Sequence, residues 1–198
     1  MKKTNQKKRK GILFVISGPS GVGKGTVARE LKKENSDINY SVSVTTRKPR
    51  PAEMDGKDYL FVSKQVFCEM MKNNEFMESA KVHNNYYGTP RKQVEKSLKQ
   101  GKNIILEIDI QGAKQIKGQY PESVLIFLTP PSIEELKHRL QKRNSESATI
   151  RKLRLKNARE ELENRKFYDY QVVNADLEDT IREIKKIIKN ETRKAGLK

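Results

Sequence analysis

Residues 12–26 read ILFVISGPSGVGKGT, an apolar, β-branched run that ends in a glycine-rich turn. Apolar residues then recur at helical spacing over residues 26–34, so we expect a strand, a loop and a helix in succession. In that context the spacing of Gly18, Gly23 and Lys24 predicts a phosphate-binding loop, or P-loop. The glycines let backbone N–H groups converge on phosphate oxygens, and the lysine adds a compact cation. The alternative, an ordinary glycine-rich turn, needs no lysine at this position.

The loop departs from the usual P-loop pattern at one position. Gly25 stands where the motif has serine or threonine to help hold Mg²⁺, and Thr26 follows it. We therefore assign no certain metal ligand and expect Mg²⁺ to be held mainly by nucleotide phosphates and water, near Thr26. The residues expected to bind the nucleotide phosphates are Gly18, Pro19, Ser20, Gly21, Val22, Gly23, Lys24, Gly25 and Thr26.

The remaining pattern predicts an α/β protein. Residues 103–109 and 123–128 are apolar enough for two more buried strands, and residues 172–173 for a short last one. Strands buried on both faces that alternate with helices indicate a parallel sheet covered on both sides. Short strands and loops are expected over 40–62, and helices over 64–80, 92–99, 150–165 and 177–190. Another helix should open at 131–135, with Ser132 and Glu135 spaced as a capping box, and break at 144–149.

Length and composition point to one globular domain. The chain has 198 residues, 34% of them hydrophobic and 34% charged, which suffices for a core without disulfides. A single cysteine and two histidines exclude a disulfide framework and a zinc cluster. A basic start followed by an apolar run is also found in signal peptides, but this run is too short and enters the glycine-rich turn. We expect a cytoplasmic protein without a membrane segment.

The net charge of +17 raises a nucleic-acid-binding protein as an alternative. Much of the basic excess lies at the two ends of the chain, in residues 1–10 and 182–198. Such charge also serves solubility and loose attraction to polyanions. Because no RNA- or DNA-binding motif accompanies it, we expect no specific nucleic-acid partner.

A second anion site is suggested by residues 41–50, which read SVSVTTRKPR. Arg47 and Arg50 are three residues apart, and Pro49 stiffens the chain between them. Guanidinium groups suit bidentate binding of a second phosphate. A solvated basic loop is the alternative that spacing alone leaves open.

Together these motifs resemble the guanylate kinase family, over about residues 11–190. The resemblance rests on Thr45-Thr46-Arg47-x-Pro49-Arg50, Asp55-Gly56-x-Asp58-Tyr59-x-Phe61, Tyr86-Tyr87-Gly88-Thr89 and Leu106-Glu107-Ile108-Asp109-Ile110-Gln111-Gly112. It implies a P-loop NTPase-type parallel sheet flanked by helices, with a mixed GMP-binding insertion and a helical lid. It also implies phosphoryl transfer from ATP to GMP, giving ADP and GDP, in purine nucleotide metabolism.

The resemblance also sets the expected boundaries. The core covers about residues 11–40, 91–133 and 159–190, the GMP-binding segment 41–90, and the lid 134–158. Basic tails are expected at 1–10, where we predict disorder, and at 191–198. Mg²⁺ would accompany ATP, dGMP is left open as an acceptor beside GMP, and the chain is expected to act as a monomer or a homodimer.

Site residues carry over from the family position by position. Those expected to bind the GMP phosphate are Arg47, Arg50, Tyr59 and Tyr87, and those near the guanine are Ser43, Glu78, Thr89 and Asp109. Glu107 stands where some members have aspartate, and it is grouped with the GMP-binding residues. The resemblance also implies that residues 18–26 bind ATP and that Mg²⁺ lies near Thr26 and Glu107. Glu78 could instead end a surface helix, as the apolar Phe76 and Met77 beside it would allow.

The lid supplies further arginines. With Lys24 and Arg47, the residues expected to act in catalysis are Arg139, Arg143 and Arg154. Arg139 and Arg143 are four apart, on one helix face, which a basic surface helix would equally explain. Asn174 resembles a residue near the ATP adenine, with a loop cap as its alternative.

One non-enzymatic alternative remains. Guanylate-kinase-like domains of scaffold proteins bind protein partners without catalysis. They typically have a degraded P-loop, whereas Gly18, Gly23 and Lys24 are intact here.

Overall fold

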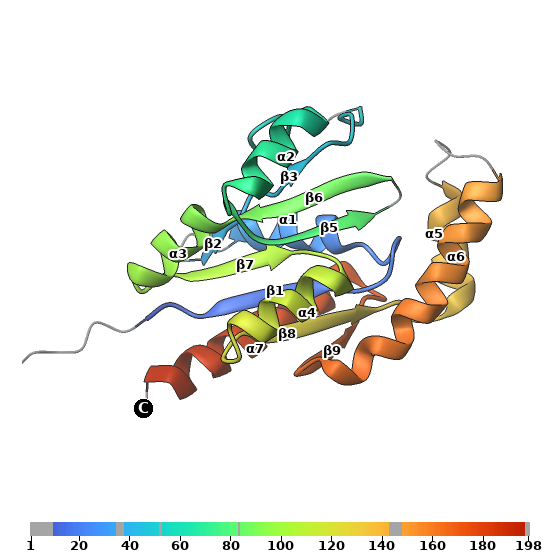
Figure 1. The fold of residues 1–198 in the computed structure, drawn as a ribbon. Helices are drawn as coiled ribbons and strands as arrows, with labels where there is room; N and C mark the ends of the chain where they lie inside the picture. Colours follow the sequence, from blue (N-terminus) through green and yellow to red (C-terminus); the bar gives the residue numbers. More distant parts are fainter. Residues whose placement is uncertain (1–9, 35–37, 52, 83, 143–147, 197–198) are drawn as a thin grey trace, which may run out of the picture.

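The computed structural model describes residues 10–34, 38–51, 53–82, 84–142 and 148–196. A five-stranded sheet forms its centre, with the strand order β2-β7-β1-β8-β9 and every neighbouring pair parallel (Figure 1). The apolar runs predict the parallel sheet and four of its strands, but not the edge strand β2. The strands of the sheet are β1 (Leu13–Ser17), β2 (Ile38–Tyr40), β7 (Asn103–Glu107), β8 (Val124–Thr129) and β9 (Tyr170–Val173).

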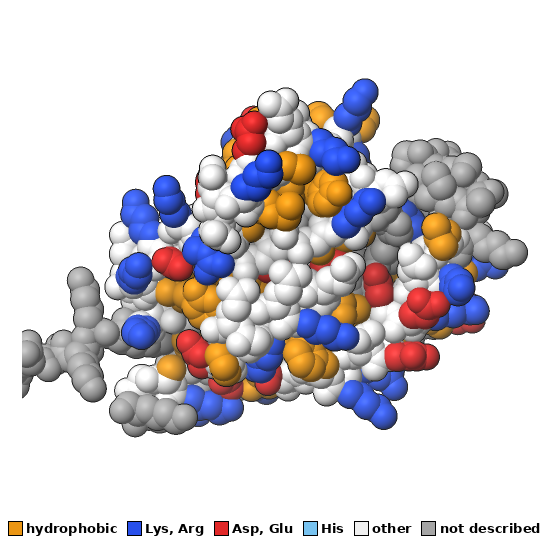
Figure 2. All heavy atoms as spheres, in the orientation of Figure 1, with side chains coloured by type: hydrophobic (Ala, Val, Ile, Leu, Met, Phe, Trp, Pro, Cys, Tyr) orange, Lys and Arg blue, Asp and Glu red, His pale blue; other side chains and the backbone are white. Residues whose placement is uncertain are grey.

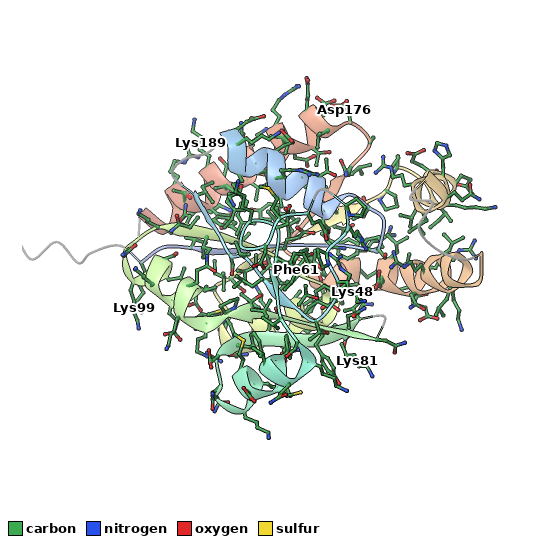
Figure 3. The ribbon with its side chains drawn as sticks, turned by 90° about the horizontal axis from the view of Figure 1, so that it is seen from above. Lys48, Phe61, Lys81, Lys99, Asp176 and Lys189 are labelled. Carbon is green, nitrogen blue, oxygen red and sulfur yellow. The ribbon has the colours of Figure 1, made fainter. Side chains whose placement is uncertain are left out.

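Helices cover both faces of this sheet. On one face α1 (Lys24–Glu34) and α7 (Leu177–Gly196) pack side by side, as the view in Figure 3 shows. On the other face α3 (Arg91–Lys99) and α4 (Ile110–Gln119) pack against the alternate side chains of the same strands. Burial on both sides explains why the inner strands β1, β7 and β8 are largely apolar, whereas the edge strands β2 and β9 are less buried and carry polar residues.

The insertion after β2 forms a second, four-stranded sheet. Its order is β4-β3-β6-β5, with β3 and β4 parallel and the other pairs antiparallel, so the sheet is mixed. Phe67 and Phe76 stack at 4.5 Å between ring centroids and hold α2 onto this sheet. The elements are β3 (Val44–Thr45), β4 (Leu60–Phe61), α2 (Lys64–Lys72), β5 (Phe76–Val82) and β6 (Asn85–Pro90).

The helix predicted over residues 64–80 is wrong in its second half. It ends at Lys72, Asn74 takes a φ of +54°, and a strand begins at Phe76. Phe76 packs into the insertion and Met77 into the main core. The two adjacent apolar residues therefore face opposite sides of a strand, which a helical interpretation of the pattern misses.

The lid consists of α5 (Ile133–Lys142) and α6 (Ala148–Glu163), followed by the short 3₁₀ helix η1 (Asn164–Phe167). Leu136, Leu140 and Ala158 form its small buried core. The predicted cap at Ser132 is present, since its Oγ accepts a 3.0 Å hydrogen bond from the Glu135 backbone N–H. In Figure 1 the lid stands at one end of the central sheet, and the insertion lies above the sheet.

The C-terminal boundary is also corrected. Helix α7 continues to Gly196, so most of the tail expected at 191–198 is helical. Asn103 Nδ2 donates to Thr192 Oγ1 at 2.8 Å and Tyr170 Oη donates to Glu191 Oε1 at 2.6 Å, which anchors this last part. The basic N-terminal segment, apart from Lys10, lies outside the described residues.

Candidate active site

A cavity of about 320 Å³ opens at the carboxyl ends of β1 and β7, where open α/β sheets bind ligands. The phosphate loop, the insertion and the lid all contribute to its walls. Sequence-predicted residues that line it are Gly18, Ser20, Gly21, Gly23, Lys24, Gly25, Thr26, Ser43, Arg47, Arg50, Tyr59, Glu78, Tyr87, Glu107, Asp109 and Arg154. The structure therefore brings together residues that are up to 136 positions apart, from Gly18 to Arg154.

The glycine-rich loop has the conformation that its sequence requires. Gly18 and Gly23 have φ values of +147° and +103°, in the region that favours glycine. A Cβ on Gly18 would lie 2.4 Å from the Leu128 carbonyl oxygen, so the loop can pass this close to β8 only with glycine there. Lys24 Nζ donates to the carbonyl oxygens of Gly18 and Pro19, at 2.6 and 3.2 Å. The lysine is thus folded back over the loop that it would serve.

Asn174 holds this loop through a side-chain hydrogen bond. Its Nδ2 donates to the Val22 carbonyl oxygen at 2.7 Å, and its Oδ1 accepts from Thr180 Oγ1 at 3.0 Å. The side chain is buried and lies 2.6 Å from where a Cβ on Gly23 would be. Both halves of the amide are bonded within the protein, which favours the loop-support alternative over the predicted adenine contact.

Glu78 is buried at the insertion end of the cavity. It lies on β5 with 4% of its surface exposed, so the surface-helix alternative for this residue is wrong. Thr89 Oγ1 donates to Glu78 Oε1 at 2.7 Å. Burial raises the pKa of Glu78 to about 7, the nearby charge of Asp109 raises it too, and the hydrogen bond from Thr89 opposes both. The site therefore holds a carboxyl group that ionises close to neutral pH.

Asp109 caps the helix that follows β7. Its Oδ1 accepts from the Gly112 backbone N–H at 2.8 Å, at the N-terminus of α4. Burial raises the pKa of Asp109, while this hydrogen bond and the charge of Lys24 act against the rise. Ser43 is buried and lines the cavity near these carboxylates.

Arg47 is held by several groups at once. Its Nη1 and Nη2 donate to the two carboxylate oxygens of Glu53, each at 2.9 Å. Its guanidinium carbon lies 5.4 Å from the ring centroid of Tyr59 and 5.7 Å from that of Phe61. Tyr59 and Tyr87 meet edge to face at 6.0 Å between centroids. These contacts hold a cation in place beside the phosphate loop.

The lid arginines differ in position. Arg154 is buried and lines the cavity, whereas Arg139 lies outside its described lining. Arg139 Nε donates to Glu135 Oε1 at 2.8 Å, and Nη1 donates to the Val22 carbonyl oxygen at 3.3 Å. Arg143 lies outside the described residues.

A carboxylate of α6 also reaches the loop. The Ser20 backbone N–H donates to Glu161 Oε2 at 3.0 Å. Burial raises the pKa of Glu161, and the charge of Lys24 and the hydrogen bond from Ser20 lower it. This acidic side chain therefore accepts a hydrogen bond from one of the N–H groups of the loop.

The residues around Gly25 suit a hard cation that keeps other oxygen ligands. A Cβ on Gly25 would lie 3.5 Å from Glu107 Oε1, and Thr26, Glu107 and Asp109 line the same cavity. Within the described residues no three histidine, cysteine or acidic side chains form a metal cluster. An oxygen-only donor set with few protein ligands fits Mg²⁺, which is commonly held by phosphates and water.

Several residues of the cavity wall were not predicted from the sequence: Arg29, Glu53, Asp58 and Glu161. For Glu53 and Asp58 a signal existed, since both lie within or beside the motifs that follow Arg50. Arg29 and Glu161 carry no local signal, because charged residues are common on the exposed side of any amphipathic helix.

A family model described as guanylate kinase matches residues 10–191. The chain belongs to the guanylate kinase family. Among curated guanylate kinases, that of Oceanobacillus iheyensis is 50% identical over 184 residues, which are 93% of this chain and 89% of the relative. That of Clostridioides difficile is 48% identical, over 95% of this chain and 92% of the relative.

Solved structures agree with this family membership. The crystal structure of guanylate kinase from Anaplasma phagocytophilum matches with a TM-score of 0.80 and 39% identity, over 93% of this chain and 88% of that one. The resemblance to the guanylate kinase family and the P-loop α/β fold class are confirmed, and so is the phosphotransferase class. The intact Gly18, Gly23 and Lys24 argue against the non-enzymatic scaffold alternative, whose P-loops are typically degraded.

Proposed function

We propose that this guanylate kinase family member transfers the terminal phosphoryl group of ATP to GMP and releases ADP and GDP. One observation carries the proposal: a phosphate-binding loop and a buried carboxylate suited to guanine open into the same cavity. Two nucleotides bound at these two places would direct their phosphates toward each other, as in-line transfer requires.

The GMP site follows from donor and acceptor chemistry. Guanine presents two adjacent donors, N1–H and the N2 amine, and a carboxylate accepts both side by side. We assign this role to Glu78, with Ser43, Thr89 and Asp109 around the base. We assign the GMP phosphate to Arg47, Arg50, Tyr59 and Tyr87.

The ATP site follows from the loop. Residues 18–26 provide the backbone N–H groups and the positive end of α1 for the phosphates. We assign Asn174 to the support of this loop, since its amide bonds the Val22 carbonyl and Thr180. Thr26 and Glu107 would hold Mg²⁺ together with ATP phosphates and water, and the ion supplies positive charge to the transferring oxygens.

We expect catalysis to consist of aligning the two nucleotides and neutralising the negative charge of the transferring phosphoryl group. Lys24, Arg47 and Arg154 contribute cations to the cavity, and we assign Arg139 and Arg143 to the same role once the lid closes. Arg139 is bonded to Glu135 through Nε and to the Val22 carbonyl through Nη1, and a phosphate would compete for these donors. Closure also excludes water that would otherwise hydrolyse ATP. A phosphate acceptor that is largely ionised at neutral pH needs no general base.

The test is a coupled ADP-release assay with ATP, Mg²⁺ and each of GMP, dGMP, AMP, CMP and UMP. We expect turnover with GMP, and turnover with dGMP because the base contacts are the same. Turnover with none of the five would remove the proposed activity. The Lys24→Ala variant, whose folding is checked by its melting temperature, controls for contaminating kinases.

Binding of nucleic acid is less well supported. Figure 2 shows lysine and arginine side chains spread over the face in view, with acidic side chains among them on the lid side, rather than gathered in one stripe.

No helix in the described parts of the chain is long and apolar enough to span a membrane. A cytoplasmic location and a monomeric or homodimeric state stay predictions from the sequence.

A further inference from the structure

Glu53 bonds the arginine that we assign to the GMP phosphate. The Arg47–Glu53 pair is bidentate, with both N···O distances at 2.9 Å. The two side chains are 14% and 18% exposed, so water screens this pair less than a surface pair. A two-point bond between planar groups fixes direction as well as distance.

The edge of the Arg47 guanidinium that Glu53 binds determines which N–H groups can bind a phosphate. Glu53 takes Nη1 and Nη2, the end of the fork, and Nη1 also donates to the Lys48 carbonyl oxygen at 2.8 Å. A guanidinium has five N–H groups, and Nε and the second Nη2 proton form its side edge; Tyr87, which we also assign to the GMP phosphate, hydrogen-bonds the same guanidinium. A phosphate can bind this side edge in a second bidentate arrangement while Glu53 keeps the first.

The same carboxylate also orders the neighbouring arginine. The Arg50 backbone N–H donates to Glu53 Oε2 at 2.7 Å, and Arg50 Nη1 lies 3.9 Å from Oε1. Burial raises the pKa of Glu53, but the hydrogen bonds and charges of Arg47 and Arg50 outweigh it, so the net pKa is lowered. The carboxylate therefore stays ionised at neutral pH and joins both arginines.

We propose that Glu53 is a positioning residue for the acceptor nucleotide: it holds Arg47 by the end of its fork so that the side edge faces the GMP phosphate. The inference rests on the proposed function. Glu53 lines the cavity together with Arg47, Arg50, Tyr59 and Tyr87, so its effect is local to the acceptor phosphate.

The test starts with Glu53→Gln, which keeps the size of the side chain and loses its charge and one acceptor. We expect KM for GMP to rise about tenfold, the equivalent of one hydrogen bond to a charged group. KM for ATP should change less than about twofold, and the melting temperature should stay within a few degrees. Glu69→Gln is the matched control, because Glu69 is exposed on α2 of the same insertion and contacts Gln65.

A double-mutant cycle then tests whether Glu53 acts through Arg47. In an Arg47→Ala background, Glu53→Gln should change KM for GMP less than about twofold. A full tenfold effect in that background would overturn the proposal. So would an unchanged or lower KM in the single variant, since a carboxylate that merely competes with the phosphate would tighten GMP binding when neutralised.

Failure of this inference is distinct from failure of the proposed function. If the parent protein does not phosphorylate GMP, the function fails; if it does and Glu53→Gln behaves like Glu69→Gln, only the positioning role fails. Should Glu53→Gln not fold, Glu53→Asp keeps the charge and shortens the reach. We expect that variant to raise KM for GMP as well, with an unchanged KM for ATP, and parent-like kinetics would overturn the role.

Discussion

Replacing Glu78 with glutamine should stabilise the protein above neutral pH and weaken its preference for GMP over AMP. Glu78 is 4% exposed, and burial raises its pKa from 4.5 to about 7. Between these two values the unfolded chain is ionised at this position while the folded protein stays protonated. Unfolding then releases a proton, so the free energy of unfolding falls as pH rises through this window.

The size of this effect follows from the shift. A difference of about 2.5 pKa units corresponds to about 3 kcal/mol, all of it lost once the pH exceeds the folded pKa. Glutamine carries no charge at any pH, and its amide oxygen can still accept the hydrogen bond from Thr89 Oγ1. For a chain of this length, about 3 kcal/mol is a melting-temperature difference of roughly 6–12 °C.

Thermal melts of both proteins at pH 5, 6, 7 and 8 provide the assay. The melting temperature of Glu78→Gln, relative to the parent, should rise with pH and level off above pH 7. Glu122→Gln, which removes an exposed carboxylate, should follow the parent at every pH. If Glu78→Gln shows the same pH dependence as the parent, Glu78 is not a buried carboxyl with a raised pKa.

Activity measures the other half of this prediction. In the proposed GMP site an ionised Glu78 would accept hydrogen bonds from guanine N1–H and N2, so Glu78→Gln should raise KM for GMP and narrow the ratio of activity with GMP to activity with AMP. Sites built on such hydrogen bonds can reject an analogue by about 10⁴-fold. In the parent, KM for GMP should rise as pH falls below about 7, because protonation removes the acceptor. An unchanged GMP-over-AMP ratio in the variant would place guanine recognition elsewhere.

Three further predictions concern the loop and the N-terminus. Lys24→Ala should lower kcat by roughly 10²-fold or more, with little change in melting temperature, and near-normal turnover would show that the loop is not catalytic. Asn174→Ala should lower stability by about 1–3 kcal/mol, because a buried hydroxyl and carbonyl lose a partner; an unchanged melting temperature with altered preference for ATP over GTP would instead indicate contact with the adenine. Deletion of residues 2–10, ahead of the first strand, should leave kcat and melting temperature nearly unchanged and weaken only salt-sensitive binding to polyanions. Loss of turnover at saturating GMP would reveal a role for this segment.

Local signals made the phosphate loop and the inner strands of the central sheet predictable. Gly18, Gly23 and Lys24 lie close together in the sequence, and β1, β7 and β8 are largely apolar runs, whereas the short edge strand β2 has no such run and was missed. Residues 73–80 were mistaken for helix because Phe76 and Met77 are adjacent, yet enter two different cores. An apolar pair of this kind has no period of its own to distinguish the two structures.

Long-range contacts were out of reach of the sequence. The role of Glu78 came from the family resemblance, and its burial shows only when β5 pairs with β6. Glu161 meets Ser20 across 141 positions, and Thr192 meets Asn103 across 89, so no local pattern marks either pair. The end of α7 was predicted too early for the same reason, because its sequence is basic and its contacts through Glu191 and Thr192 are with residues far away in the sequence.

Because the Ser20 N–H is bonded to Glu161 of the lid helix α6, hydrogen exchange at Ser20 can report on opening of the lid. An N–H in a partly exposed turn normally exchanges with solvent quickly, but here exchange requires α6 to separate from the loop. The exchange rate of the Ser20 amide, measured without nucleotide, should therefore report how often the lid opens. In the proposed ATP complex a phosphate oxygen would replace the Glu161 carboxylate, so the Ser20 N–H would stay protected while α6 would be released from the loop. With nucleotide bound, exchange at Ser20 should stay slow while exchange along α6 becomes faster. The nucleotide concentration at which the two rates diverge would then mark binding at the loop.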